Sequence, residues 1–123
     1  MSDPLVSIVM PAFDGGAYIG EALRSVFDQT FEDYEVVIVD DDSHDDTIEV
    51  ISAFSDPRLR VLRNDQRLGP VENWNRALEE ARGELVKVMA QDDVMYRTCL
   101  EQQVSALRAH SGASFVAVRR RII

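Results

Sequence analysis

Acidic side chains gather at two points of the chain, each directly after a short apolar run. Residues 40–42 are three consecutive Asp that follow the run 36–39, and the Asp pair at 92–93 lies shortly after the run 85–89. Crowded carboxylates repel one another, so they persist where a cation or hydrogen-bond donors lie between them. Hard divalent cations such as Mg²⁺ and Mn²⁺ prefer oxygen ligands. If the clusters meet in space, the sequence predicts a cation site able to bridge the phosphates of a nucleotide.

A purely structural interpretation of the same clusters stands beside the chemical one. Asp is common at helix caps and in solvated turns, and Asp42, Asp45 and Asp46 fit such roles. A single cluster favours this interpretation. Two clusters that converge at one edge of a sheet leave both interpretations open, because that edge is where ligands bind.

The elements that must position the clusters alternate between strand and helix. Apolar, β-branched runs typical of buried strands occupy residues 5–10, 36–39, 59–62, 85–89 and 114–118. Apolar residues at helical spacing fill the intervals, within residues 19–27, 48–54, 71–81 and 100–107. This order predicts an α/β fold of three layers, α/β/α, with a mostly parallel sheet. Both acidic clusters then follow the carboxyl ends of strands, where such sheets bind ligands.

Local signals predict how some of the helices begin, end and pack. Ser43 with Asp46 three residues later resembles a capping box. Pro70 suits the first turn of the third helix, and Gly83 is placed to end it. Trp74 lies on the apolar face of that helix and is predicted to pack in the core.

Composition excludes some classes of partner. The chain of 123 residues has the length of one domain and is 46% hydrophobic, which suffices for a core. Its net charge of -9 argues against binding to a nucleic-acid backbone. Cys99 is the only cysteine, so no internal disulfide forms. No signal peptide or membrane-spanning run is evident, so we expect a cytoplasmic location, at the cytoplasmic face of the membrane for a longer protein.

Several segments, in the right order, resemble motifs of the family 2 glycosyltransferases, which are inverting enzymes. Residues 6–14 resemble the family's opening strand, which runs to Pro-Ala-Tyr-Asn. Residues 35–47 resemble the signature Val-Asp-Asp-Gly-Ser-x-Asp-x-Thr. Residues 25–30, 64–69, 75–78 and 81–86 resemble further family motifs. The resemblance covers nearly the whole chain. It implies the GT-A fold of nucleotide-diphospho-sugar transferases and leaves the sugar and the acceptor open.

The resemblance also implies roles for particular residues. The nucleotide would be bound by Pro11, Ala12, Phe13, Asp14, Asp41 and Asp92. In this arrangement Asp41 contacts the base, and Asp92 with Asp93 faces the diphosphate and a Mn²⁺ or Mg²⁺ ion. Phe13 is either a surface on which the base stacks or a partly buried aromatic residue.

The chain departs from the family pattern at three positions. Asp14 stands where Asn is usual, and Ala90 stands where the first Asp of Asp-x-Asp-Asp is expected. The second departure places the predicted metal binding on Asp92 and Asp93 alone. Asp42 replaces a Gly that often adopts a positive φ, a conformation that Asp tolerates better than most residues.

The family's catalytic base and acceptor-binding region lie beyond its fifth strand. We therefore expect residues 1–123 to be a truncated GT-A domain that supplies donor binding, with the base beyond Ile123. We expect a UDP-sugar donor, with a sugar on another nucleotide as the alternative, and a glycan, lipid or protein acceptor. The chain by itself is predicted to bind the nucleotide without transferring sugar efficiently. The oligomeric state stays open, a homodimer included.

Two alternatives come from other classes of protein. One is a non-catalytic nucleotide-binding or interaction module of the same fold, which Ala90 and the missing base favour. The other is a phosphoacceptor receiver domain, which has a similar length and an acidic pocket. A receiver domain places paired acids after its first strand, whereas this chain has residues 11–13, Pro-Ala-Phe, at that point.

Overall fold

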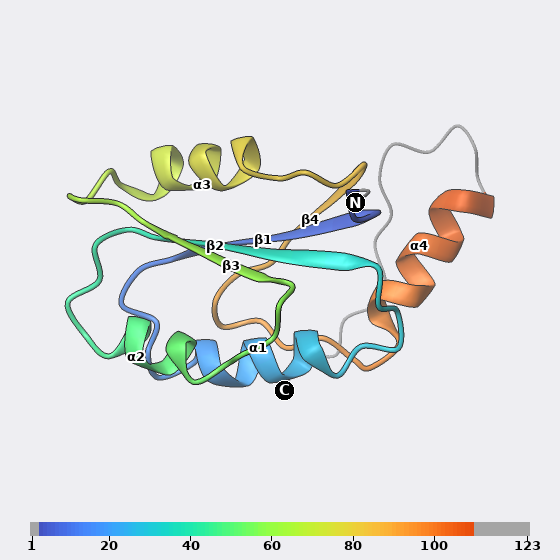
Figure 1. The fold of residues 1–123 in the computed structure, drawn as a ribbon, viewed down its shortest axis with the longest axis horizontal. Helices are drawn as coiled ribbons and strands as arrows, with labels where there is room; N and C mark the ends of the chain where they lie inside the picture. The colour runs from blue at the N-terminus through green and yellow to red at the C-terminus, as the bar shows by residue number, and fades with distance from the viewer. Residues whose placement is uncertain (1–2, 110–123) are drawn as a thin grey trace.

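The computed structural model describes residues 3–109, which form a parallel four-stranded sheet in the order β3-β2-β1-β4 (Figure 1). The elements in chain order are β1 (Val6–Ala12), α1 (Ile19–Phe27), β2 (Tyr34–Asp40), α2 (Thr47–Ser52), β3 (Leu59–Arg63), α3 (Pro70–Glu79), β4 (Leu85–Val88) and α4 (Cys99–Ala109). The predicted alternation of strands and helices is confirmed over this range. The fifth strand predicted at residues 114–118 lies outside the described residues.

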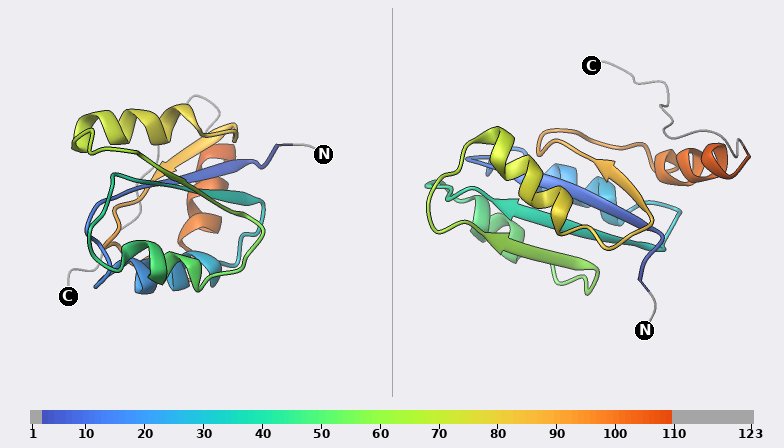
Figure 2. Two further views of the ribbon diagram at one scale, coloured as in Figure 1. Left: turned by 60° about the vertical axis from the view of Figure 1, so that its left-hand side comes forward. Right: turned by 90° about the horizontal axis from the view of Figure 1, so that it is seen from above.

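Helices cover both faces of the sheet, as the α/β/α prediction requires. Figures 1 and 2 show α3 on one face and α1 with α2 on the other. The larger core lies between the sheet and α1, and its fully buried side chains include Ile8, Met10, Leu23 and Ile38. The smaller core, under α3, consists of Val9, Val37, Val39 and Ala77. No helix within residues 3–109 has the length and apolar character needed to cross a membrane.

The register of the central strands sets the position of the acidic clusters. Ala12 of β1 lies beside Asp40 of β2, so the residues after both strands leave the sheet together. β4 pairs with the other side of β1 and ends at Val88, opposite Val9. Because all the strands are parallel, these three carboxyl ends meet at one edge of the sheet.

The face of helix α3 that contacts the sheet is not the one predicted from its apolar residues. Its buried residues are Asn73 and Ala77, whereas Val71 and Trp74 are exposed, Trp74 to 40%. The prediction that Trp74 packs in the core is therefore wrong. The small Ala77 side chain faces the β-branched residues of the sheet, and the Asn73 amide donates to the Val39 carbonyl oxygen at 2.9 Å. This close approach turns the larger apolar side chains away from the sheet.

Two further local predictions are corrected by the structure. Helix α3 ends at Glu79 and not at Gly83, which instead passes against β1, where an added Cβ would lie 2.7 Å from the Ser7 backbone nitrogen. The capping box also does not form, because Asp46 makes no side-chain bond at the start of α2. Asp45 supplies the side-chain bond at the start of α2 instead: its carboxylate accepts a hydrogen bond from the Thr47 backbone nitrogen at 2.9 Å. Pro70 begins α3 as predicted.

Candidate nucleotide-binding site

A cavity of about 360 Å³ opens at the carboxyl ends of β1, β2 and β4. Its lining residues are Pro11, Ala12, Phe13, Tyr18, Asp41, Arg67, Pro70, Asn73, Trp74, Ala90, Gln91 and Asp92. One residue from each acidic cluster is among them. The structure thus brings together five of the residues that the sequence predicted for this site.

Asp41 lies at the centre of a hydrogen-bond network under the cavity. It is 2% exposed, and its Oδ1 accepts hydrogen bonds from the Asn64 amide at 2.8 Å and the Leu68 backbone nitrogen at 2.7 Å. Its Oδ2 accepts one from the Gly69 backbone nitrogen at 3.0 Å. Burial raises the pKa of Asp41, but these three bonds and the charge of Arg67 outweigh it and hold the pKa below its usual value. Asp41 is therefore a carboxylate at neutral pH.

Two buried amides connect Asp41 to the sheet and to α3. Asn64 follows β3, and its side-chain nitrogen donates to both the Asp41 carboxylate and the Asn73 side-chain oxygen, each at 2.8 Å. Asn73 in turn donates to the Val39 carbonyl oxygen. Arg76 donates to the Asn64 side-chain oxygen. The start of α3 and the loop before it are thus fixed around Asp41 by buried polar contacts.

Phe13 is held in place through its backbone. The Gln91 side chain accepts a hydrogen bond from the Phe13 nitrogen and donates one to the Phe13 carbonyl oxygen, both at 2.9 Å. These two bonds join the end of β1 to the turn after β4. The Arg67 guanidinium lies over the Phe13 ring, with its carbon 4.0 Å from the ring centroid. Phe13 is partly buried and also lines the cavity, so it has features of both roles that the sequence left open.

The two residues of the second acidic cluster have different surroundings. Asp92 is exposed and lines the cavity. Asp93 is partly buried, and its carboxylate accepts a hydrogen bond from the Ala90 backbone nitrogen at 3.2 Å. Asp92 is therefore the carboxylate of this pair that faces the space available to a ligand.

Asp14 and the other two residues of the first cluster support the loops around the cavity. Asp14 does not line the cavity: its carboxylate accepts from the His44 backbone nitrogen, and its own nitrogen donates to the Ser43 hydroxyl, both at 2.9 Å. Asp40 is fully buried and accepts from the Ser43 hydroxyl at 2.6 Å. Asp42 has a φ of 58°, which confirms the positive φ expected where the family has Gly.

Most of the chain is similar to known glycosyltransferases. The family described as Glycosyl transferase family 2 matches residues 7–123. The chain belongs to this family. It is 36% identical over 107 residues to the Escherichia coli UDP-Glc:alpha-D-GlcNAc-diphosphoundecaprenol beta-1,3-glucosyltransferase WfgD, a match to 87% of this chain and 42% of that protein. It is 42% identical over 90 residues to an uncharacterized protein of Mycobacterium tuberculosis, a match to 73% of this chain and 28% of that protein.

Solved structures of similar proteins share the fold. Residues 1–349 of TarS from S. aureus, in complex with UDP-GlcNAc, match with a TM-score of 0.82 and 30% identity over 90% of this chain and 32% of that chain. The mannosyltransferase PcManGT from Pyrobaculum calidifontis, in complex with GDP-Man and Mn²⁺, matches with a TM-score of 0.77 and 28% identity over 87% of this chain and 33% of that chain. The predicted GT-A type of fold is thus confirmed. This chain spans less than half the length of these relatives.

Members of glycosyl transferase family 2 can use a divalent metal ion. The residues at this cavity could supply only part of the ligands of such an ion. Within residues 3–109, no three His, Cys, Asp or Glu side chains are placed to hold an ion by themselves. Mg²⁺ keeps several waters in many sites, where one or two carboxylates and substrate phosphates complete its ligands. Asp92 fits that kind of site, because it faces the cavity.

Sequence reasoning missed several residues of the site. Tyr18, Arg67, Asn73 and Trp74 line the cavity without having been predicted to do so. Gln91 also lines the cavity, and its position just after a strand and before the acidic pair indicated this in the sequence. Arg67 and Asn73 lie on either side of the Gly69–Pro70 turn, but no spacing rule distinguishes them from ordinary surface residues.

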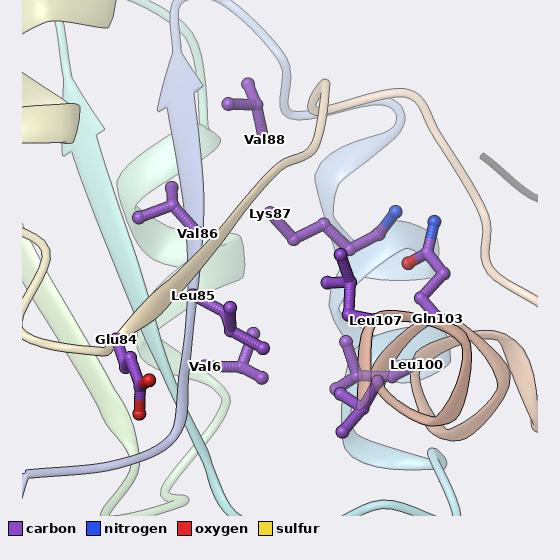
Figure 3. A pocket seen from close by; sticks show the side chains of 10 residues that line it. Val6, Glu84, Leu85, Val86, Lys87, Val88, Leu100, Gln103 and Leu107 are labelled. Atoms are coloured by element: carbon purple, nitrogen blue, oxygen red, sulfur yellow. The ribbon is translucent and has the colours of Figure 1, made fainter. Parts of the chain in front are cut away.

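A second cavity, of about 420 Å³, lies between β4 and α4 and differs in chemistry (Figure 3). Most of its lining is apolar, including Leu85, Leu100 and Leu107. Figure 3 shows Glu84 apart from Lys87 and Gln103, so its polar side chains do not converge on one point. No pair of carboxylates lines it. Of the strand-end cavity and this second cavity, only the strand-end cavity has both the carboxylates that a cation requires and a positive charge for a diphosphate.

Proposed function

We propose that this chain binds the UDP part of a UDP-sugar, in a protein that transfers the sugar to a glycan, lipid or protein acceptor with inversion. The relatives support a nucleotide-sugar donor but not a particular nucleotide. The name of WfgD specifies UDP-Glc, TarS is in complex with UDP-GlcNAc, and PcManGT is in complex with GDP-Man. The choice of uridine therefore has to come from the site itself.

The hydrogen bonds already made by Asp41 support uridine. A carboxylate has about four acceptor positions, two on each oxygen. Both positions on Oδ1 are used by Asn64 and Leu68, and one on Oδ2 is used by Gly69. One acceptor position remains on the residue proposed to contact the base.

A single acceptor position suits the edge of uracil better than the edge of guanine. Uracil presents one N–H between two carbonyl oxygens. Guanine presents two neighbouring donors, an N–H and an amino group, which pair best with both oxygens of a carboxylate. On Asp41 the second guanine donor would face an oxygen whose acceptor positions are full. A donor left without a partner costs affinity, so we expect UDP to bind more tightly than GDP.

The remaining predicted residues complete the proposed donor site. Pro11 and Ala12 border the nucleoside, and Phe13 offers its ring to the base. Asp92, assisted by Asp93, would hold Mn²⁺ or Mg²⁺ together with the diphosphate. When bound, such an ion stabilises the charge that develops on the diphosphate leaving group. Asp14 serves this site indirectly in the proposal, through its bonds to Ser43 and His44.

Sugar transfer needs groups that we place in a longer protein. The acceptor hydroxyl attacks the anomeric carbon, the bond from that carbon to the diphosphate oxygen breaks, and a base takes the hydroxyl proton. In the proposal this base and the acceptor site lie beyond Ile123. We also propose that the longer protein works at the cytoplasmic face of a membrane. The E. coli and Campylobacter jejuni relatives support this, since their names specify undecaprenol-linked acceptors.

Calorimetry on the 123-residue chain tests the proposal. We expect UDP to bind more tightly in the presence of Mn²⁺ than in its absence, and more tightly than GDP under both conditions. Asp41→Asn should abolish the preference for UDP over GDP. Tighter binding of GDP would contradict the argument from Asp41.

The same titrations test the non-catalytic alternative. Ala90 at the usual Asp position and the absence of a preformed cluster of metal ligands among residues 3–109 favour that alternative. If no nucleoside diphosphate binds with or without Mn²⁺, the chain is an interaction module that has kept the fold.

A further inference from the structure

Arg67 is placed to meet the negative charge of the donor. Among the described residues that line the strand-end cavity, it is the one with a positive charge, whereas Asp41 and Asp92 are negative. A diphosphate that enters beside two carboxylates is repelled unless positive charge lies close to it. A divalent cation supplies part of that charge. The position of Arg67 suggests a second source.

The side chain of Arg67 forms no ion pair with a described carboxylate, although its backbone is fixed. The next two residues, Leu68 and Gly69, donate their backbone N–H groups to Asp41. These bonds fix the backbone of Arg67 beside the cavity. The Arg67 side chain itself is exposed and has no carboxylate within 4.0 Å in the described part of the chain. Arg58, by contrast, forms an ion pair with Asp56 at 2.8 Å.

The present contact of Arg67 is one that a ligand would compete for. Its guanidinium covers one face of the Phe13 ring, with 4.0 Å between its carbon and the ring centroid. That ring is the stacking surface proposed for the base. A cation over an aromatic ring at an exposed site is held weakly, whereas a guanidinium binds a phosphate through two parallel charge-assisted hydrogen bonds. Exchange of the first contact for the second is therefore favourable.

We propose that Arg67 is a specificity-determining residue that couples recognition of the base to recognition of the diphosphate. In the free protein its guanidinium covers Phe13. The incoming base displaces it from the ring, and the released guanidinium binds the diphosphate. A nucleoside without phosphates meets Arg67 only as a competitor, while a nucleoside diphosphate gains from it. This inference rests on the proposed nucleotide-binding function.

Removal of the Arg67 guanidinium should affect uridine binding and UDP binding differently. A residue that only stabilised the loop before α3 would affect both ligands alike. Removal of the guanidinium takes away a competitor for Phe13, so Arg67→Ala should leave uridine binding unchanged or tighten it. The same variant should weaken UDP binding about tenfold or more, because charge-assisted hydrogen bonds to phosphate are lost. Arg67→Lys keeps the charge but cannot form the bidentate pair of hydrogen bonds. Its UDP affinity should therefore fall between that of the wild type and that of Arg67→Ala.

Calorimetry with uridine and UDP, in the presence of Mn²⁺, tests this on the 123-residue chain. Trp74 is the only tryptophan and lines the same cavity, so its fluorescence gives a second measure of occupancy. Arg108→Ala on α4 is the matched control, because Arg108 is exposed and lines no part of this cavity. It should match the wild type with both ligands.

The possible results are distinct. A UDP-specific loss in Arg67→Ala supports the proposal. Equal losses of uridine and UDP affinity, or no change in either, overturn the role of Arg67 and leave the proposed function standing. A wild-type chain that binds no UDP overturns both.

Discussion

The carboxylate of Asp41 holds the loop before α3 against the end of β2, so its replacement by Asn should destabilise the protein. Three donors point at this carboxylate: the Asn64 amide and the backbone nitrogens of Leu68 and Gly69, at 2.8, 2.7 and 3.0 Å. An Asn side chain keeps one acceptor oxygen and places an NH₂ group where the second oxygen was. If its oxygen faces Asn64 and Leu68, its NH₂ faces the N–H of Gly69, and the opposite orientation sets two donors against the NH₂.

The size of the effect follows from these contacts. One donor left facing another costs about 1–3 kcal/mol, and two bonds that change from a charged to a neutral acceptor weaken by about 1 kcal/mol each. We therefore expect Asp41→Asn to lower the free energy of unfolding by about 3–5 kcal/mol. That is a large share of the stability of a typical domain.

Urea unfolding followed by Trp74 fluorescence and circular dichroism measures this loss. Asp42→Asn is the matched control. The Asp42 side chain is 28% exposed, its contact with Arg63 is 3.6 Å long, and Asn tolerates its φ of 58° as well as Asp does. The control should change stability by less than about 0.5 kcal/mol. Equal stability of the two variants at pH 7 would refute the reasoning about Asp41.

The effect of pH supplies an independent check with a definite sign. Hydrogen bonds hold the pKa of folded Asp41 below its usual value against the opposing effect of burial. A group with a lowered folded-state pKa stabilises the protein above its unfolded-state pKa, about 3.9 for Asp, and loses that contribution as the pH falls through the folded-state pKa. The stability difference between the wild type and Asp41→Asn should therefore be constant from about pH 8 to 5 and shrink below about pH 4. A difference that grows on acidification would contradict this sign.

Three further predictions concern the support of the site and its metal ion. Gly83→Ala should lower the free energy of unfolding by about 1–3 kcal/mol, measured by urea unfolding, because its Cβ would press on the buried Ser7 backbone, 2.7 Å away. Gln91→Met removes both hydrogen bonds to Phe13, so calorimetry should show weaker UDP binding, with a loss of stability of about 1–3 kcal/mol. Asp92→Asn should abolish the gain in UDP affinity from Mn²⁺, and a chelator should bring the wild type to the affinity of the variant; a gain that survives in the variant would exclude Asp92 as a ligand.

The central strands β1 and β2 followed from the sequence because they are buried on both faces. Every residue of β2 is buried, so its apolar run has no polar interruption that a helix or an exposed strand would show. The parallel arrangement then placed the ends of β2 and β4 at one edge, and Asp41 and Asp92 share a cavity there. The positive φ of Asp42 was predictable for a local reason, since few residues other than Gly tolerate it as well as Asp and Asn.

The packing of α3 was not predictable from periodicity. A pattern of apolar residues reveals a stripe, but it assumes that the stripe faces the sheet. Here the polar Asn73 takes a buried position because its amide satisfies the Val39 carbonyl oxygen and accepts from Asn64. These partners come from different elements, 34 and 9 residues away. Trp74, the next residue, is consequently turned to the cavity.

The three consecutive Asp of the first cluster have separate tasks, which reconciles the chemical and structural interpretations of the sequence. Asp40 accepts from Ser43, whose hydroxyl in turn accepts from the Asp14 nitrogen, so this carboxylate ties the loops after β1 and β2 together. Asp42 turns the backbone through its positive φ. Asp41, between them, accepts from the loop before α3 and retains one acceptor position. An acidic cluster can therefore consist mostly of structural residues and still present one carboxylate to a ligand, because the outer residues fix the direction of the middle one.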